Sequence, residues 1–242
     1  MASYHLSIKS GKKGTAVEHA NYIAREGKFR KGQKREDLLV LAHGNLPEWA
    51  NNNPAVLWKM ADKHERKNGA AYREFEMALP HELTLEQNLE LFNDFIRHEV
   101  GNKPYQFAIH APMASLGKVV QTHGHLMVSD RIPDDIIRLP EQHFRRYNSA
   151  HPELGGCKKD SGGKDRAAMR EHAISIRSSF ADYQNKYLAK YGHAARVDHR
   201  SNRDRGLTSE PEQHLGSSAI SKMTSEEKEQ YKAKRSSKNQ HS

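Results

Sequence analysis

The 242-residue chain carries 39 lysines and arginines against 30 aspartates and glutamates, which gives a formal net charge of +9, and 36% of its residues are hydrophobic. This length fits one domain, or one domain with an appendage, and the positive charge favours a polyanionic partner, with nucleic acid as the first choice. The single cysteine, Cys157, excludes an internal disulfide framework and a cysteine-rich zinc site. No stretch approaches the roughly 18 apolar residues of a membrane span, and we expect a cytoplasmic protein.

The chain begins with a predicted strand and a predicted helix. Residues 4–9 alternate between apolar and polar side chains, which indicates a short strand. A helix is predicted over residues 15–26, with Thr15 and Glu18 as a capping box at its start. Tyr22 lies off the apolar stripe of this helix, among charged neighbours, so its hydroxyl is available for chemistry. A half-exposed surface tyrosine is the alternative interpretation.

The middle of the chain alternates between strands and helices. We predict, in order, a strand at 38–42, a helix at 54–68, a strand at 72–80 and a helix behind the capping box Thr84–Gln87. Glu74 and Glu76 share one face of the third strand, because side chains alternate along a strand. The ordinary interpretation is that two such acids are simply solvated on the surface. Facing a histidine cluster, they would instead orient imidazoles or accept a proton.

Two further strands carry three histidines. His110 ends the run 107–110, and His123 and His125 lie two residues apart in the run 122–128, so both of those imidazoles leave the same face. If the two runs pair as a hairpin, the three imidazoles converge. Three neutral imidazoles and an open position make a divalent-metal site with room for a substrate oxygen. The chain has 16 histidines, so a close pair can arise by chance, but the third histidine makes the metal site the favoured interpretation.

The C-terminal part is predicted to hold two helices and a basic loop before a polar tail. The helices cover residues 140–147 and 166–191, and residues 148–166 form a loop rich in glycine, lysine and serine. Such a loop suits a phosphate backbone but is equally an ordinary linker. Residues 201–242 are polar and lack hydrophobic periodicity, so we expect a mostly disordered tail. The expected organisation is one domain over 1–200 followed by this basic tail.

A helical tyrosine, a three-histidine metal site, paired acids and a basic chain together suggest phosphodiester transesterification. The metal would hold a non-bridging oxygen and offset the charge that builds up in the transition state. The tyrosine oxygen would attack phosphorus in line and form a phosphotyrosine ester, with a sugar hydroxyl as the leaving group. Because the ester conserves the bond energy, reversal of the reaction would rejoin the strand.

The motifs, taken in order, resemble the MobA/MobL mobilisation relaxases of the HUH endonuclease group. Each matching segment is weak alone, and together they are specific over roughly residues 1–200. The segments that carry the resemblance are Tyr4-His5-Leu6, Tyr22-Ile23-Ala24-Arg25-Glu26-Gly27-Lys28, Glu74-Phe75-Glu76-Met77-Ala78-Leu79-Pro80, Ala108-Ile109-His110, His123-Gly124-His125-Leu126-Met127-Val128-Ser129-Asp130-Arg131, Phe144-Arg145-Arg146-Tyr147-Asn148 and Asp198-His199-Arg200.

The resemblance implies an α+β fold with a central antiparallel sheet, helices packed on it and a palm-like core. The implied catalytic tyrosine, metal ligands and neighbouring acids are, respectively, Tyr22; His110, His123 and His125; and Glu74 and Glu76. The substrate would be single-stranded DNA at a plasmid transfer origin, nicked to leave a 5′-phosphotyrosine and a free 3′-hydroxyl. The metal would be Mg²⁺ or Mn²⁺, although three imidazoles also suit Zn²⁺, Ni²⁺ or Cu²⁺. Accessory mobilisation proteins and a coupling protein are the expected partners.

Positively charged side chains in the basic turns, loops and motifs are expected to contact DNA: Lys12, Lys13, Arg25, Lys28, Arg131, Arg145, Arg146, Lys158 and Lys159. Three other functions stay open. A rolling-circle replication initiator often carries a second tyrosine one helical turn away, where this chain has Glu18 and Glu26. A non-catalytic regulator that binds its origin would not need Tyr22 and the three histidines together. A metal-dependent nuclease that uses water would survive the loss of Tyr22.

Overall fold

The computed structural model describes residues 4–30, 37–113, 120–194, 197–208, 220 and 222–239. The chain divides into two compact units. The first holds Met1–Ala111 and Thr122–His199, and the second holds Pro112–Gln121 and Arg200–Ser242. The candidate site lies in the first unit.

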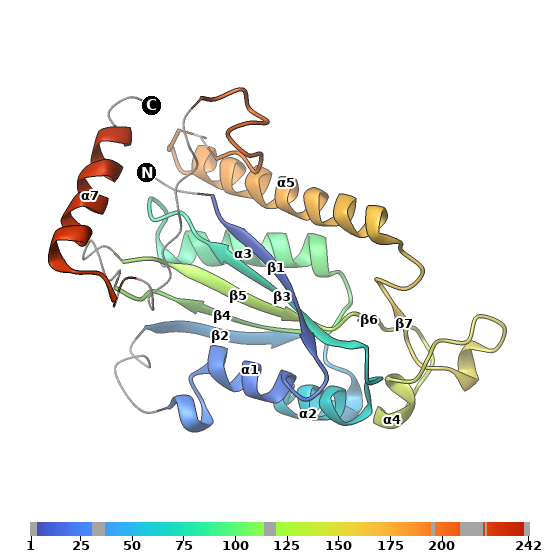
Figure 1. Ribbon diagram of the computed structural model, residues 1–242. Coiled ribbons are helices and arrows are strands. Elements are labelled where there is room, and N and C mark those ends of the chain that lie inside the picture. The colour runs from blue at the N-terminus through green and yellow to red at the C-terminus, as the bar shows by residue number, and fades with distance from the viewer. Residues whose placement is uncertain are drawn as a thin grey trace. The chain divides into compact units, whose positions relative to one another are not determined.

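A five-stranded antiparallel sheet forms the centre of the first unit (Figure 1). Its order from edge to edge is β1 (Leu6–Lys12), β3 (Ala70–Ala78), β5 (His123–Val128), β4 (Tyr105–His110) and β2 (Leu38–Gly44). Every neighbouring pair of these strands is antiparallel. The predicted α+β class with a central antiparallel sheet is therefore confirmed.

The helices cover both faces of the sheet (Figure 1). On one face lie α1 (Ala16–Ala24) and α2 (Pro54–His64), and on the other lie α3 (Leu85–Val100) and α5 (Arg166–Lys190). Shorter elements complete the unit: the 3₁₀ turns η1 (Gly27–Phe29), η3 (Glu48–Ala50) and η4 (Pro152–Leu154), the helix α4 (Pro140–His143), and the strand pair β6 (Arg131–Ile132) and β7 (Lys158–Lys159).

The alternation of β3 divides its side chains between two apolar cores. Phe75 and Met77 are buried against α3 and α5, whereas Tyr72 packs with α1 and α2. Glu74 and Glu76 therefore leave β3 on the α1/α2 face, and the sheet register places Glu76 beside His125 of β5. The two acids and the histidines share this face.

Gly124 separates the two histidines of β5 and faces the opposite core. A Cβ atom built on Gly124 would lie 2.5 Å from Cε2 of Phe92, a fully buried ring of α3. The Phe92 ring also packs against Phe107, with 5.0 Å between ring centroids. Any larger residue at position 124 would have to move this ring, so the glycine lets α3 pack closely behind the histidine pair.

One of the two predicted helix caps is present and the other is replaced. The Thr84–Gln87 capping box of α3 is present as predicted. Thr15 does not cap α1, because its hydroxyl donates to the carbonyl of Lys12. The N-terminal amides of α1 instead donate to the carboxylate of Asp62, which reaches over from α2. A tertiary acceptor therefore replaces the local capping box.

Both α1 and α2 end earlier than predicted, and each end serves a contact. Helix α1 stops at Ala24 because Arg25 adopts the left-handed conformation, with φ of 56°. Helix α2 stops at His64, where the backbone of Glu65 is extended. The side chains of Arg25 and Glu65 are both buried, so each helix end delivers a charged group into the interior.

The second unit contains a helix where no regular structure was expected. Helix α7 spans Ser225–Asn239. Its start is a reciprocal cap, in which the amide of Thr224 donates to Glu227 Oε2 at 2.7 Å and the amide of Glu227 donates to Thr224 Oγ1 at 3.2 Å. This Thr-x-x-Glu pattern is the sequence signal that could have predicted it. Among the residues that the structure describes, none of the helices is long and apolar enough to cross a membrane.

Candidate metal centre

The predicted hairpin brings the three histidines together. β4 and β5 pair antiparallel with His110 directly opposite His123. The ring centroids lie 5.5 Å apart for His110 and His123, 5.2 Å for His110 and His125, and 5.1 Å for His123 and His125. His110 and His125 are buried and His123 is partly exposed. The cluster is therefore open on the side of His123.

Two neighbours decide which ring nitrogens carry a proton and which keep a lone pair. Nε2 of His110 lies 2.7 Å from the carbonyl oxygen of Ile23, which can only accept, so Nε2 carries the proton and Nδ1 keeps the lone pair. Nδ1 of His125 lies 2.9 Å from Glu74 Oε1, so this nitrogen donates and Nε2 keeps the lone pair. Contacts of this kind fix the tautomer of metal-binding histidines in general.

The donor set fits a divalent metal ion. One ligand nitrogen from each of His110, His123 and His125 lies within 4.8 Å of the other two. Burial lowers the pKa of His110 to about 4 despite the opposing contact with Ile23, so this ring is neutral near pH 7 and its lone pair is not lost to a proton. Neutral imidazole is the form that binds metals.

Glu74 and Glu76 lie on the same strand but have different surroundings. Glu74 is buried, and Oε1 contacts both Nδ1 of His125 and Nε2 of His19, the latter at 2.7 Å. Burial raises the pKa of Glu74, but the contacts with the two histidines outweigh it and lower the pKa to about 2. Glu76 pairs with Lys9 at 2.7 Å and its side chain is 33% exposed. Glu74 is thus the acid built into the cluster.

Tyr22 lies beside the histidine cluster. Its ring centroid is 6.2 Å from that of His125, edge-on, and 5.4 Å from that of Phe29. The guanidinium carbon of Arg25 lies 4.9 Å from the Tyr22 centroid. The ring therefore has aromatic neighbours in addition to Arg25, one of the charged neighbours expected from the sequence.

His19 is a residue of this site that the sequence analysis did not single out as functional. It lies one helical turn before Tyr22 on α1, and the two ring centroids are 6.0 Å apart. The His19 ring also stacks on Tyr72, with 5.1 Å between ring centroids and 11° between ring planes. With its contact to Glu74, His19 connects the tyrosine helix to the acid that orients His125. The spacing of three residues from Tyr22 was the available signal.

The nine basic residues predicted to contact DNA divide into exposed and buried groups. Lys12, Lys13, Lys28, Arg145, Arg146 and Lys158 are exposed, although Lys28 pairs with Glu18. Arg25, Arg131 and Lys159 are mostly enclosed, with side-chain exposures of 5%, 3% and 10%. The donors of these three side chains are already bonded to protein groups. We therefore assign them to contacts within the protein and leave them out of the proposed DNA surface.

Arg131 and Lys159 belong to a second buried cluster, which we call the arm cluster: Glu65, Arg131, Arg138, His143, Cys157 and Lys159. The Arg131 guanidinium donates to both oxygens of Glu65 and to the carbonyls of Phe144, Arg145 and Cys157. Arg138 donates to the carbonyls of Pro152 and Gly155. A Cβ on Gly156 would lie 2.3 Å from the Arg145 carbonyl oxygen. The predicted basic loop is therefore folded tightly over 152–159.

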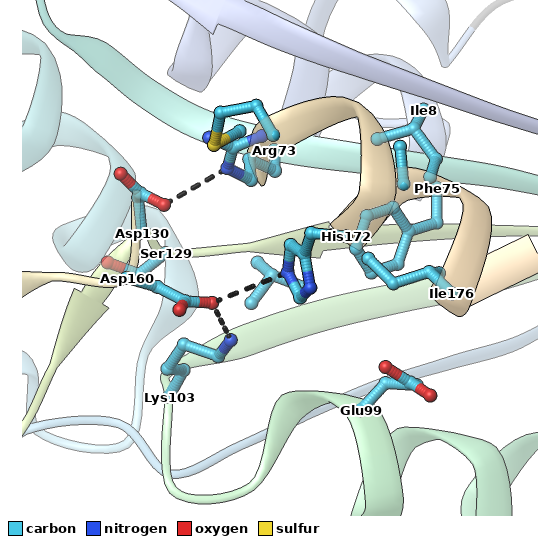
Figure 2. Close-up of a pocket in the computed structure, with 13 residues that line it drawn as sticks. Ile8, Arg73, Phe75, Glu99, Lys103, Ser129, Asp130, Asp160, His172 and Ile176 are labelled. Carbon is cyan, nitrogen blue, oxygen red and sulfur yellow. Dashed lines mark hydrogen bonds and ion pairs between the residues drawn. The ribbon is translucent and has the colours of Figure 1, made fainter. Parts of the chain in front are cut away.

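A small pocket lies under the first turns of α5 (Figure 2). Phe75 lines it, and because Phe75 belongs to the core on the α3/α5 face, the pocket is on the opposite face of the sheet from the histidines. Asp160 accepts from Lys103 at 2.7 Å, and Arg73 donates to Asp130 at 3.0 Å. Within each pair the positive and negative charges neutralise each other at the rim of the pocket. The floor is apolar and includes Ile8, Phe75, Val128, Met169 and Ile176. We assign no chemistry to this pocket.

The fold and the site define a class: α+β proteins that hold a three-histidine centre and a neighbouring tyrosine on one face of an antiparallel sheet. A family model described as "MobA/MobL family" matches residues 13–225, and the chain belongs to this family. It is 48% identical over 211 residues to the "43 kDa relaxation protein" of Salmonella typhimurium, covering 87% of this chain and 57% of that protein. It is 39% identical over 225 residues to "Mobilization protein A" of Escherichia coli, covering 91% of this chain and 30% of that protein.

The chain thus spans between about a third and just over half of the length of these two relatives. A solved structure described as "Molecular Basis of Vancomycin Resistance Transfer in Staphylococcus aureus" is also similar. It has a TM-score of 0.59 and 21% identity, and the match covers 83% of this chain and 100% of that one. At this identity the likeness concerns the fold alone.

Proposed function

We propose that this chain is a DNA relaxase that nicks one strand at a plasmid transfer origin. The observation that carries the proposal is the position of Tyr22, whose ring lies edge-on to His125 of a cluster in which one nitrogen from each of three histidines lies within 4.8 Å of the others. Membership of the MobA/MobL family and the relatives described as relaxation and mobilisation proteins support it.

In the proposed reaction, the phenolic oxygen of Tyr22 attacks phosphorus and forms a new O–P bond. The bond from phosphorus to the 3′ oxygen breaks, the tyrosine loses its proton and the 3′ oxygen gains one, which leaves a 5′-phosphotyrosine and a free 3′-hydroxyl. A divalent metal, when bound, supplies positive charge to the phosphate oxygens as negative charge develops. Mn²⁺ or Mg²⁺ is the proposed ion.

Glu74 suits an orienting role better than the role of base. Its pKa of about 2 lies far below the tyrosine value of about 10, so it is a weak acceptor for the phenol proton. Held by His125 and His19, its carboxylate fixes the His125 ring instead. Glu76 is paired with Lys9 and partly exposed, so we propose that it contributes less than Glu74 to the orientation of the histidines.

The proposed DNA surface consists of the exposed basic residues Lys12, Lys13, Lys28, Arg145, Arg146 and Lys158. Positive side chains of this kind bind phosphates without reading sequence. Residues 1–200 are the proposed catalytic domain, so removal of residues 207–242 should leave the nicking of a short oligonucleotide intact. Accessory mobilisation proteins, a coupling protein and a cytoplasmic location remain part of the proposal.

The test is to incubate the protein and Mn²⁺ with a single strand that spans the transfer origin, followed by a denaturing gel. We expect a slow DNA–protein band whose peptide mass maps to Tyr22. Tyr22→Phe should abolish the band and leave DNA binding within about twofold, since one hydroxyl contributes little to a charged interface. Tyr147→Phe is the matched control.

Other outcomes of this experiment point to other functions. An adduct on a different tyrosine would overturn the assignment of Tyr22. Cleavage without an adduct would indicate a nuclease that uses water. Binding with neither cleavage nor adduct would leave a DNA-binding protein whose histidines stabilise the fold.

A further inference from the structure

The lone pair that His110 offers to the cluster already accepts a hydrogen bond. Since Nε2 donates to the carbonyl of Ile23, Nδ1 is the nitrogen left for a metal. Nη2 of Arg25 lies 3.1 Å from this Nδ1. Because a guanidinium group can only donate, the Arg25 N–H points at the nitrogen that would bind the ion.

The guanidinium of Arg25 is fixed on its other sides. Its Nε and Nη2 donate to the two oxygens of Asp37 at 3.1 and 3.3 Å, and its Nη1 donates to the carbonyl of Tyr22 at 2.9 Å. Arg25 is only 6% exposed, and it is the left-handed residue that ends α1. Its position is therefore set by the fold, unlike that of a surface arginine that samples many rotamers.

We propose that Arg25 competes with a divalent cation for the Nδ1 lone pair of His110 and so sets the metal affinity of the three-histidine centre. The proposal rests on the metal centre of the proposed function and adds a positioning residue to it. One lone pair cannot serve an N–H donor and a metal ion together. In addition, two positive charges this close repel each other strongly inside a protein.

The same side chain links the metal centre to the tyrosine. The Arg25 guanidinium lies over the Tyr22 ring and bonds to the Tyr22 carbonyl. When Arg25 leaves His110, it keeps Asp37 as a partner, but the cation over the Tyr22 ring must shift. Metal occupancy and the surroundings of the nucleophile are thus coupled through one residue, and Asp37 is the anchor about which Arg25 moves.

Isothermal titration calorimetry with MnCl₂ tests the competition. Arg25→Met keeps the length of the side chain and removes its charge and donors. We expect Arg25→Met to bind Mn²⁺ at least about tenfold more tightly than the unmodified chain. Lys28→Met is the control for the loss of one positive charge near the same helix end, because Lys28 is exposed and pairs with Glu18. It should change the affinity by less than about threefold, because exposed charges are screened.

A double-mutant comparison places the effect at His110. In a His110→Ala background, Arg25→Met should tighten Mn²⁺ binding less than it does in the unmodified chain, because the competition for Nδ1 is gone and only the removal of charge repulsion remains. Equal or weaker binding by Arg25→Met alone would overturn the proposal. If neither the unmodified chain nor Arg25→Met binds Mn²⁺, the metal centre of the proposed function fails as well, whereas binding by the unmodified chain without tightening removes only the role of Arg25.

A measurement on the unmodified chain covers the case in which Arg25→Met does not fold. Zn²⁺ is diamagnetic, so nitrogen NMR can follow the side chains of His110 and Arg25 during a Zn²⁺ titration. We expect the His110 Nδ1 signal and the Arg25 guanidinium signals to change at the same Zn²⁺ concentrations. A His110 signal that shifts while Arg25 stays unchanged would show that the guanidinium does not compete.

Discussion

Arg25 and Arg131 are both buried arginines, with 6% and 2% of their surfaces exposed, yet they face different acceptors. Arg131 donates to the Glu65 carboxylate and to three backbone carbonyls. Arg25 also donates to a carboxylate and a carbonyl, but a further acceptor is the imidazole of His110. A carbonyl is satisfied by its hydrogen bond, whereas an imidazole nitrogen can exchange its donor for a metal.

The two clusters around these arginines contain similar residues. Each has a buried histidine whose pKa is lowered to about 4, first by burial: His110 in the metal centre and His143 in the arm cluster. In the metal centre, one ligand nitrogen from each of three imidazoles lies within 4.8 Å of the other two. In the arm cluster, His143 Nδ1 lies 3.3 Å from the Cys157 thiol. Burial and residue type are therefore shared, and the convergence of three imidazoles distinguishes the candidate site.

The largest effect is expected from a substitution that breaks the arm cluster. Arg131→Met removes the closest cation of the buried Glu65 carboxylate and leaves it with Lys159 at 3.1 Å and Arg66 at 3.9 Å. We expect the free energy of unfolding to fall by about 3–5 kcal/mol, the usual consequence of removing one partner of a buried pair. Urea denaturation measures this. Substitution of the exposed Arg145 by Met should change the free energy of unfolding by no more than about 0.5 kcal/mol. A similar loss in both variants would show that the buried position of Arg131 is not the cause.

A smaller effect is expected on the pH dependence of stability, through His143. Since the folded pKa is about 4 and an unfolded histidine titrates near 6.5, the unfolded chain takes up the proton first. Stability is therefore present above pH 6.5 and is lost as the pH falls toward 4, by at most about 3 kcal/mol from this group.

Urea denaturation at several pH values between 4 and 7 measures that loss. His143→Asn should reduce the steepness of the stability profile, and the exposed His151→Asn serves as the control for loss of one imidazole. A profile that His143→Asn leaves as steep as before would show that His143 is not held neutral by the fold.

The third prediction compares the two acids of β3. Glu74→Gln removes the carboxylate that holds the His125 ring and should weaken Mn²⁺ binding by about 10–100-fold. Glu76→Gln is the matched control on the same strand, and it should weaken binding much less, because Glu76 pairs with Lys9. Titration calorimetry measures both. Equal losses would mean that net charge, and not the contact with His125, controls the affinity.

The smallest expected effect is on the helix that carries Tyr22. Asp62→Ala removes the acceptor for the amides of Gly14, Ala16 and Val17 at the start of α1. The loss of such a cap should cost about 1 kcal/mol, measured by urea denaturation. Thr15→Ala should cost less if Asp62 is the true cap. A greater loss of stability in Thr15→Ala than in Asp62→Ala would show that the Thr15 side chain, and not Asp62, caps the start of α1.

Local pattern was enough for much of the fold. Period-two alternation predicted β1 and β3, and the Thr84–Gln87 box marked the start of α3. The histidine hairpin followed from spacing, because alternation alone places His123 and His125 on one face. The ends of α1 and α2 were wrong by a few residues, since Arg25 and Glu65 leave helical geometry for contacts with residues distant in the chain.

The sequence by itself determined that His123 and His125 share a face of one strand, that Glu74 and Glu76 share a face of another, and the resemblance to the family, which implied the antiparallel α+β class. These depend on periodicity and short motifs, which are local. Only the tertiary structure decided that Glu74 contacts His125, that Asp62 caps α1 and that Arg25 lies on His110. Each of these contacts joins residues 46 or more positions apart. No local pattern specifies which distant side chain meets another, because that depends on how the strands and helices pack.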